Sequence, residues 1–186
     1  MQGNLELATF GAGCFWGTEK YYARDFESEN PGSILGTSVG YMNENPNARP
    51  NPSYEEVCDG MTGYVEVVHV LFDSDKADFR KLCKFLFQFH DPTTLNRQGN
   101  DTGSQYKSAI FYHSEEQKKV AEEVIESLQK FMNQGKIDKF ETSTVRTAVS
   151  KATKFYAGED YHQRYLESQP WGYCNHKIRF KWDIIE

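Results

Sequence analysis

The stretch LELATFGAGCFWGTEKYYARDF, residues 5–26, joins a predicted strand to a predicted helix through a glycine-rich junction that contains Cys14. Apolar and polar residues alternate over Leu5 to Phe10, which is typical of a strand, and Phe15 to Phe26 is predicted to be helical. The start of a helix exposes unpaired N–H groups and the positive end of its dipole. We therefore expect Cys14 to have a lowered pKa and a reactive thiolate. The alternative is a cysteine that only fills the core.

The composition restricts the class of protein. A chain of 186 residues with 38% hydrophobic and 15% aromatic residues fits one globular domain. A net charge of −6 argues against nucleic-acid binding, which needs a basic surface. We also expect no membrane span, because no apolar run is long enough. The N-terminus lacks the pattern of a signal peptide, so we expect a cytoplasmic protein.

Four cysteines are present, and no two of them form a CxxC pair. This spacing argues against a structural zinc site, and the low density argues against a disulfide framework. Cys83 lies on the apolar face of a predicted helix and is expected in the core, whereas the role of Cys58 stays open. Cys174 follows a Pro-Trp-Gly segment in an irregular tail, where a mobile thiol can resolve an oxidised partner or stay an exposed bystander.

The order of predicted elements indicates the fold class. Strands are expected over 5–10, 34–41, 64–72, 105–112 and 141–149, and helices over 15–26, 77–89, 114–135 and 159–168. Residues 42–53 and 91–103 are predicted loops. This order predicts an α+β fold: a single-domain, two-layer sandwich with a mixed β-sheet core and helices packed mainly on one side. The domain spans residues 1–186, and its irregular tail begins at about residue 169.

Four further polar side chains are candidates for the site. Glu66 lies inside a predicted strand, where carboxylates are depleted. The pattern alone favours a solvent-facing strand end, while a semi-apolar pocket would favour the neutral acid, which can donate a proton. Tyr54 and Tyr106 flank polar loops and can be ordinary half-buried tyrosines or hydrogen-bond donors. Asp101, in GNDTGSQY, most simply makes turn hydrogen bonds.

Four blocks of sequence together resemble a known family. They are GCFWGTE around Cys14, NPSYEEVCDGMTGYVEV at 51–67, FHDPTTLNRQGNDTGSQYKSAI at 89–110 and YHQRYLESQPWGYC at 161–174. In this order they resemble the peptide methionine sulfoxide reductase A family over nearly the whole chain. The resemblance implies an α+β sandwich around a mixed sheet, in agreement with the element order.

The resemblance implies roles for the residues around the junction. Cys14 matches the nucleophile, and Cys174 matches the resolving cysteine. Phe15 and Trp16 match the aromatic residues that hold the methyl group of the substrate. These matches make the strand-to-helix junction the centre of the expected active site.

It also implies roles for the polar candidates. Glu66 matches the acid that protonates the sulfoxide oxygen. Tyr54 and Tyr106 match phenols that hydrogen-bond that oxygen, and Asp101 matches a supporting carboxylate. Together with Cys14 and Cys174 they form the expected catalytic set.

The activity implied by this resemblance is thiol-dependent reduction of methionine S-sulfoxide, free or in proteins, which repairs oxidative damage. A Cys14 sulfenic acid forms first, and a Cys14–Cys174 disulfide follows. Thioredoxin is the external reductant, and no metal or bound organic cofactor is expected. We expect a monomer. A thiol peroxidase with the same sulfenic acid cycle, and a peptide-binding module that holds methionine without chemistry, are the alternatives.

The chain departs from the family pattern at several positions. Tyr64 stands where the family usually has His, so a contact near Glu66 is expected to differ. Lys107 stands where Arg is common, and Met42-Asn43-Glu44 replaces a usual glycine pair. After Cys174 the chain lacks the glycine-rich tail and second recycling cysteine of some members. Recycling is therefore expected to need only Cys14 and Cys174, with Cys58 as a possible auxiliary thiol.

Overall fold

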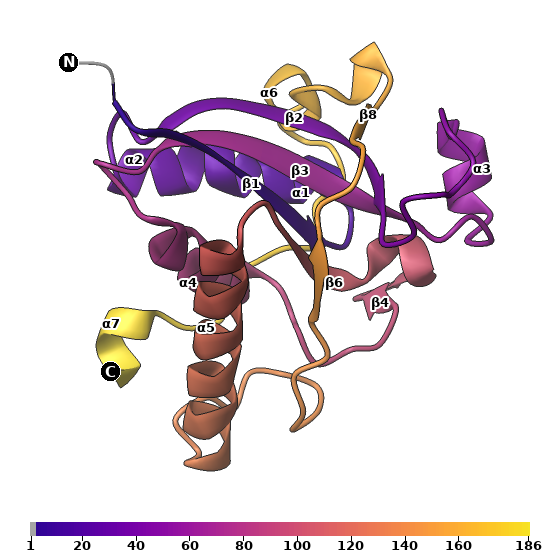
Figure 1. The fold of residues 1–186 in the computed structure, drawn as a ribbon. Coiled ribbons are helices and arrows are strands. Elements are labelled where there is room, and N and C mark those ends of the chain that lie inside the picture. The colour runs from indigo at the N-terminus through magenta and orange to yellow at the C-terminus, as the bar shows by residue number, and fades with distance from the viewer. Residues whose placement is uncertain (1–2) are drawn as a thin grey trace.

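A six-stranded mixed sheet organises the computed structural model, which describes residues 3–186 (Figure 1). The strand order is β7-β6-β1-β3-β2-β8, and β6 and β7 are the parallel pair. The strands of this sheet are β1 (Leu5–Ala12), β2 (Ile34–Asn43), β3 (Tyr64–Asp73), β6 (Ser108–Tyr112), β7 (Ala148–Lys151) and β8 (Tyr156–Ala157). A separate two-stranded hairpin consists of β4 (Arg97–Gln98) and β5 (Asp101–Thr102). The predicted mixed-sheet α+β fold is confirmed.

Strand register brings the glycine-rich junction next to the middle of the sheet. Phe10 of β1 pairs with Val68 of β3, and Tyr41 of β2 pairs with Glu66 of β3. Two residues beyond Phe10, β1 ends at Ala12, so the chain turns into the following helix beside Glu66. The register of two central strands therefore places Cys14 and Glu66 close together.

The two longest regular α-helices begin at residues whose side chains cap them, whereas the first helix has no side-chain cap. The first helix runs without a break through α1 (Phe15–Lys20), the π-helical turn η1 (Tyr21–Phe26) and α2 (Glu27–Glu29). At the start of α4 (Phe79–Phe89) the Asp78 side chain accepts a hydrogen bond from the N–H of Lys81. At the start of α5 (Glu115–Asn133) the Ser114 hydroxyl accepts one from the N–H of Gln117. The Gln117 side chain bonds His113 rather than Ser114, so the predicted capping box is one-sided.

The core lies mainly between the sheet and these helices. Alternate residues of β3, among them Val68 and Val70, face the helices and belong to the larger apolar cluster. Val65 and Val67 face the other side, where a smaller cluster is covered by the chain around Phe155. Because side chains alternate along a strand, Glu66 lies on the helix-facing side with Val68.

Short helical segments complete the chain, and several of them differ from the predictions. They are α3 (Tyr54–Cys58), η2 (Ser104–Tyr106), η3 (Asp160–His162), α6 (Tyr165–Ser168) and α7 (Trp182–Ile185). The predicted 105–112 strand begins only at Ser108, after η2. The predicted 159–168 helix is interrupted at Arg164, which has a left-handed backbone with φ of 53°. The tail after residue 169 is irregular up to the short helix α7.

The predicted strand at 141–149 is wrong over most of its length, because β7 covers only Ala148–Lys151. The preceding segment is held instead by hydrogen bonds to a loop. The N–H of Glu141 donates to the Asp91 carboxylate, and the N–H of Thr142 donates to the Thr93 hydroxyl. These side chains satisfy backbone groups that a sheet would otherwise satisfy.

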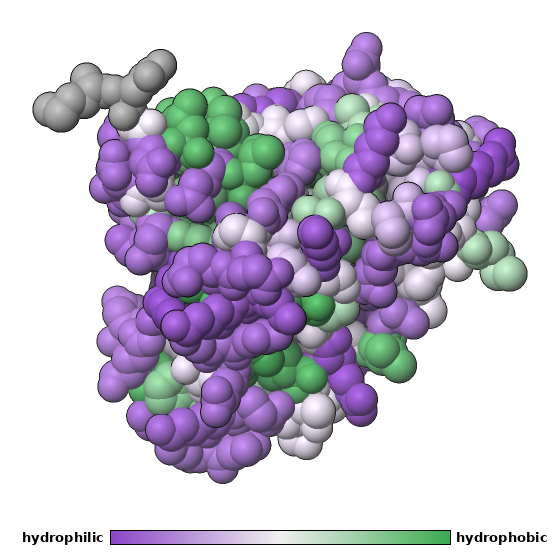
Figure 2. All heavy atoms as spheres, in the orientation of Figure 1, coloured by the Kyte–Doolittle hydropathy of each residue, from purple (hydrophilic) through white to green (hydrophobic). Residues whose placement is uncertain are grey.

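Most of the surface on the face shown in Figure 2 is hydrophilic. Hydrophobic side chains gather over the start of β1 and β2, where Leu5, Leu7 and Leu35 are each at least 40% exposed. Within residues 3–186, no helix is both long and apolar enough to cross a membrane.

Candidate active site

Cys14 is the N-cap residue of α1, at the junction predicted from the sequence. Gly13 precedes it with φ of 86°, and a Cβ atom at Gly13 would lie 2.6 Å from Cβ of Gln98. Only glycine fits this turn easily, for both reasons. The Cys14 side chain is 8% exposed, so its sulfur lies just below the surface.

The pKa of the Cys14 thiol is raised, and the expectation of a lowered pKa is wrong. Burial is the largest cause, and the nearby Glu66 carboxyl adds to it. The backbone N–H of Trp16 acts in the opposite direction, as expected at a helix start, but its effect is smaller. The resting site therefore holds Cys14 as a thiol.

Glu66 occupies a buried position at the start of α1. Its carboxyl is 2% exposed, and its Oε1 accepts a hydrogen bond of 3.2 Å from the N–H of Phe15. Burial raises the pKa of Glu66 to about 8, although the Phe15 hydrogen bond opposes this shift. The solvent-facing interpretation is thus wrong, and the carboxyl is mostly protonated at neutral pH. It can donate a proton next to Cys14.

Two phenols lie near this carboxyl. Tyr54 begins α3 and Tyr106 ends η2, and both are half-buried. Burial raises the pKa of each phenol, and the Glu66 charge adds to both shifts. Both hydroxyls therefore keep their protons and can donate hydrogen bonds to an oxygen in this space. The Cys58 thiol, one helical turn after Tyr54, also raises the Tyr54 pKa.

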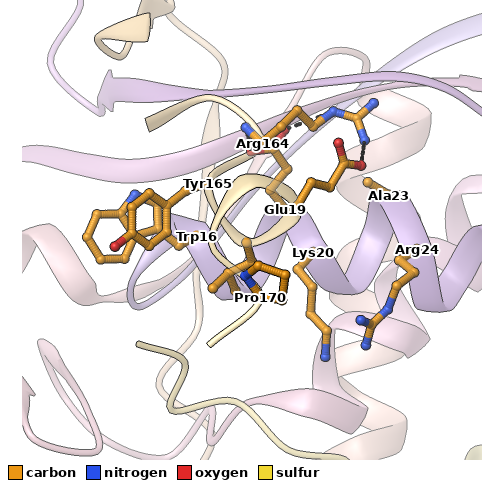
Figure 3. A pocket seen from close by; sticks show the side chains of 10 residues that line it. Trp16, Glu19, Lys20, Ala23, Arg24, Arg164, Tyr165 and Pro170 are labelled. Atoms are coloured by element: carbon orange, nitrogen blue, oxygen red, sulfur yellow. Dashed lines mark hydrogen bonds and ion pairs between the residues drawn. The ribbon is translucent and has the colours of Figure 1, made fainter. Parts of the chain in front are cut away.

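The aromatic pair after Cys14 has unequal exposure. Phe15 is 1% exposed, and its ring packs against Tyr41 and His162, with centroids 5.8 and 5.1 Å away. Trp16 is half-buried, and Tyr165 of α6 stacks on it with ring centroids 3.8 Å apart (Figure 3). The predicted methyl-binding role of both rings stays a prediction, and Trp16 has the more open surface.

His162 is a site residue that the sequence analysis did not single out, although it lies in the quoted YHQRYL block. Its Nδ1 accepts a 3.0 Å hydrogen bond from Nε1 of Trp16, and its ring lies 4.5 Å from that of Tyr54. The ring is completely buried. His162 thus contacts both the Trp16 and the Tyr54 side chains from within the core.

The tail that carries Cys174 is held against α1. His176 is buried, its Nε2 lies 2.5 Å from the carbonyl oxygen of Ala12, and its own carbonyl accepts a hydrogen bond from the Tyr21 hydroxyl. A Cβ atom at Gly17 would lie 3.0 Å from the Cys174 sulfur and would overlap Nδ1 of His176. The absence of a side chain at Gly17 therefore lets the exposed Cys174 approach the first turn of α1.

Asp101 binds the residues on both sides of Cys174. Its Oδ2 accepts hydrogen bonds of 3.1 Å from the Tyr173 hydroxyl and from Nδ2 of Asn175. Asn175 also donates to the carbonyl of Gln98. In the structure Asp101 positions the tail, in place of the turn hydrogen bonds that the sequence alone suggested.

Two of the departures from the family pattern contact each other. Nζ of Lys107 lies 2.6 Å from the Glu44 carboxylate. Tyr64 donates a 2.8 Å hydrogen bond to the carbonyl of Arg49, so its hydroxyl holds the 44–53 loop instead of contacting Glu66. These departures from the family pattern therefore affect the contacts of the 44–53 loop, and Tyr64 makes no hydrogen bond to Glu66.

The structure thus brings Cys14, Glu66 and Cys174 to one end of the sheet, with the two phenols and Asp101 near them. All four cysteines are reduced. Among residues 3–186, no group of three or more His, Cys, Asp or Glu side chains is arranged to hold a metal ion.

Comparisons with known proteins identify the family of the chain. The peptide methionine sulfoxide reductase family model matches residues 6–185. Peptide methionine sulfoxide reductase MsrA of Methanothermobacter thermautotrophicus is 44% identical over 169 residues, which cover 91% of this chain and 90% of that protein. Peptide methionine sulfoxide reductase A4, chloroplastic, of Arabidopsis thaliana is 45% identical over 87% of this chain and 55% of that protein.

Solved structures show the same relationship. Mxr1 from Saccharomyces cerevisiae in reduced form has a TM-score of 0.81 and 35% identity, with 95% of this chain and 93% of that chain covered. Methionine sulfoxide reductase A of Corynebacterium diphtheriae has a TM-score of 0.74 and 35% identity, with coverages of 93% and 79%. With its fold and nearly its whole length matched, the chain belongs to the peptide methionine sulfoxide reductase A family and is a methionine sulfoxide reductase.

Proposed function

We propose that the chain reduces methionine S-sulfoxide to methionine by transferring the oxygen to the Cys14 sulfur. The supporting observation is the buried Glu66 carboxyl, with a pKa of about 8, beside the Cys14 thiol. A sulfoxide oxygen leaves its sulfur easily only when its negative charge is neutralised by a proton. A positioned acid of this kind is typically worth ~10²–10⁴ in rate.

The step balances without an added reactant. The Cys14 sulfur bonds to the sulfoxide sulfur while Glu66 gives its proton to the oxygen. The sulfur–oxygen bond of the substrate then breaks, and the oxygen bonds to the Cys14 sulfur as a hydroxyl. The bond between the two sulfurs breaks with its electron pair returning to the methionine sulfur, so methionine leaves and Cys14 becomes a sulfenic acid. The thiol proton of Cys14 replaces the one that Glu66 gave away. The hydroxyls of Tyr54 and Tyr106 hydrogen-bond the oxygen as its charge develops.

Recycling uses the docked tail. The Cys174 thiol condenses with the Cys14 sulfenic acid, which forms a disulfide and releases water. Thioredoxin then reduces this disulfide by thiol–disulfide exchange. Mxr1, which is 35% identical to this chain in its reduced form, has also been solved in complex with Trx2, and this supports the choice of reductant. The cycle needs no metal and no bound organic cofactor.

The two aromatic residues after Cys14 supply the proposed binding surface for the substrate. Trp16 offers an apolar surface for the substrate methyl group, with Phe15 beneath it in the core. Both free and protein-bound methionine sulfoxide fit a site at the surface, and repair of oxidised proteins is the expected role. We expect this role in the cytoplasm, where thioredoxin keeps thiols reduced, and we expect a monomer.

Single-turnover chemistry tests the proposal. Reduced protein without external reductant is mixed with each separated sulfoxide epimer, and methionine and free thiols are counted. We expect about one methionine per protein from the S epimer and loss of the Cys14 and Cys174 thiols. Cys14→Ser should abolish methionine formation, whereas Cys174→Ser should still form it once. Cys83→Ser is the control, because Cys83 is buried in the core. A thiol peroxidase or a binding module would form no methionine.

A further inference from the structure

Trp171 is exceptional among the large apolar side chains of residues 3–186, because it is 99% exposed. It lies three positions before Cys174, and the intervening Tyr173 is 46% exposed. Neither the mechanism nor the core uses Trp171. Trp side chains that are exposed in a free protein are characteristic anchors of protein interfaces, where they become buried.

The backbone holds Trp171 in a fixed position. The N–H of Gly172 donates a 2.8 Å hydrogen bond to the carbonyl of Gln169, which closes a turn with Pro170 and Trp171 at its centre. A Cβ atom at Gly172 would lie 2.6 Å from the Tyr165 ring, so the turn packs directly on α6. Pro170 points into a groove of about 270 Å³ beside Trp16 (Figure 3), while Trp171 points to solvent. Little backbone entropy is then lost when a partner covers Trp171.

Exposure also decides which sulfur a protein reductant can reach. Cys174 is exposed, whereas Cys14 is 8% exposed and lies beneath it at the helix start. The reductant thiolate therefore bonds to the Cys174 sulfur, and the bond to Cys14 breaks, with Cys14 regaining its proton. The second thiol of the reductant then displaces Cys174 and leaves as part of the oxidised reductant.

The size of an interface places Trp171 within reach of a protein bound at Cys174. Even a small redox complex buries about 600 Å² per partner, a patch with a radius of about 14 Å. Three residues of chain span at most about 11 Å. A patch of this size centred on Cys174 therefore extends past the backbone of Trp171.

We propose that Trp171 is the anchor by which a protein dithiol of the thioredoxin class docks beside Cys174. This inference rests on the proposed recycling and adds a specificity-determining residue to it. The indole is buried in the complex, and it contributes affinity for the protein reductant. It contributes nothing to small dithiols, which reach Cys174 without an interface.

Trp171→Ala tests this anchor in the 186-residue protein. Thioredoxin is varied at saturating methionine sulfoxide, and kcat and KM for thioredoxin are measured. Dithiothreitol-driven turnover and single-turnover methionine release are measured in parallel. We expect KM for thioredoxin to rise about 30-fold (about 2 kcal/mol), with the other two rates unchanged. Trp171→Phe should recover part of the affinity, because it keeps an exposed aromatic ring.

Ile184→Ala is the matched control, since Ile184 is 78% exposed on α7 and lies outside the tail turn. It should leave all three measurements unchanged. A KM for thioredoxin within about twofold of the wild-type value in Trp171→Ala overturns the proposal. A fall in dithiothreitol-driven turnover as large as the fall in thioredoxin-driven turnover also overturns it. Normal single turnover without any reduction by thioredoxin also overturns it. Absence of methionine in the wild-type single turnover refutes the proposed function instead.

Discussion

Glu66→Gln should stabilise the folded protein and at the same time slow its reaction. The folded state raises the pKa of Glu66 from its ordinary 4.5 to about 8, mainly through burial. Below pH 4.5 the carboxyl is neutral in both the folded and the unfolded chain, so burial carries no ionisation cost. Between pH 4.5 and 8 the unfolded chain releases the proton and the folded chain keeps it, so stability falls as pH rises.

The magnitude follows from the size of this pKa shift. Each pH unit between the two values costs about 1.4 kcal/mol of folding free energy. The cost attributed to Glu66 is therefore about 1 kcal/mol at pH 5, about 3 at pH 7 and about 4 at pH 8. Glutamine is neutral at every pH, and its amide oxygen can still accept the N–H of Phe15. Glu66→Gln should therefore remove the cost and keep the hydrogen bond.

Urea unfolding of the reduced wild-type and Glu66→Gln proteins at pH 5, 6, 7 and 8 measures this difference. The stability gain of the variant should widen with pH, while its single-turnover rate should fall ~10²–10⁴-fold. Glu122→Gln, on the exposed face of α5, is the control and should show neither effect. Parallel stability curves for wild type and Glu66→Gln would refute the burial of an ionisable carboxyl at this position.

Three further predictions concern the surroundings of the site. Gly17→Ala places a methyl group against His176, so we expect the folded protein to lose about 1–3 kcal/mol of stability. Thioredoxin-linked turnover should slow, while single-turnover methionine release is retained. A variant with the thioredoxin-linked rate of the wild type would contradict the close packing. Burial lowers the pKa of His176 to about 4. The stability that its buried neutral ring contributes to the fold is therefore complete above pH 6.5 and is lost as pH falls toward 4. Other histidines with pKa values lowered by burial cost stability over the same range, so urea unfolding of the wild type is compared with that of His176→Gln. The variant should lose about 2 kcal/mol less than the wild type between pH 7.5 and 5, and equal losses would exclude this contribution. Tyr54→Phe and Tyr106→Phe should each lower the single-turnover rate about tenfold, and an unchanged rate in the double variant would remove the phenols from the mechanism.

The sequence was sufficient wherever periodicity decided the structure. The strand predicted over 64–72 corresponds to β3 (Tyr64–Asp73), and the helix predicted over 77–89 corresponds to α4 (Phe79–Phe89). In both, the buried positions recur with the period of the element, so each element is selected by burial of its own apolar face. The position of Cys14 at a helix start was predictable for the same reason, because both flanking elements have clear patterns.

The sequence was insufficient wherever contacts between residues far apart in the chain determined the structure. The failure of the 141–149 strand depends on Asp91 and Thr93, about 50 residues away in the sequence. The position of the C-terminal tail depends on the hydrogen bond between Nε2 of His176 and the carbonyl oxygen of Ala12. Local propensity carries no information on such contacts between residues that are far apart in the sequence.

The same distinction explains why the thiol pKa was predicted in the wrong direction. The helix start favours a thiolate, but the burial of Cys14 and the nearby carboxyl of Glu66 both oppose one. The burial of a residue depends on the whole fold, so the local sequence does not reveal it. Two like negative charges in one buried site repel each other, so an ionised Glu66 makes ionisation of the Cys14 sulfur less favourable. Ionisation of Glu66 therefore removes the proton donor and opposes formation of the thiolate at the same time. A rise in pH above about 8 should thus cost the site its acid without supplying it with a nucleophile.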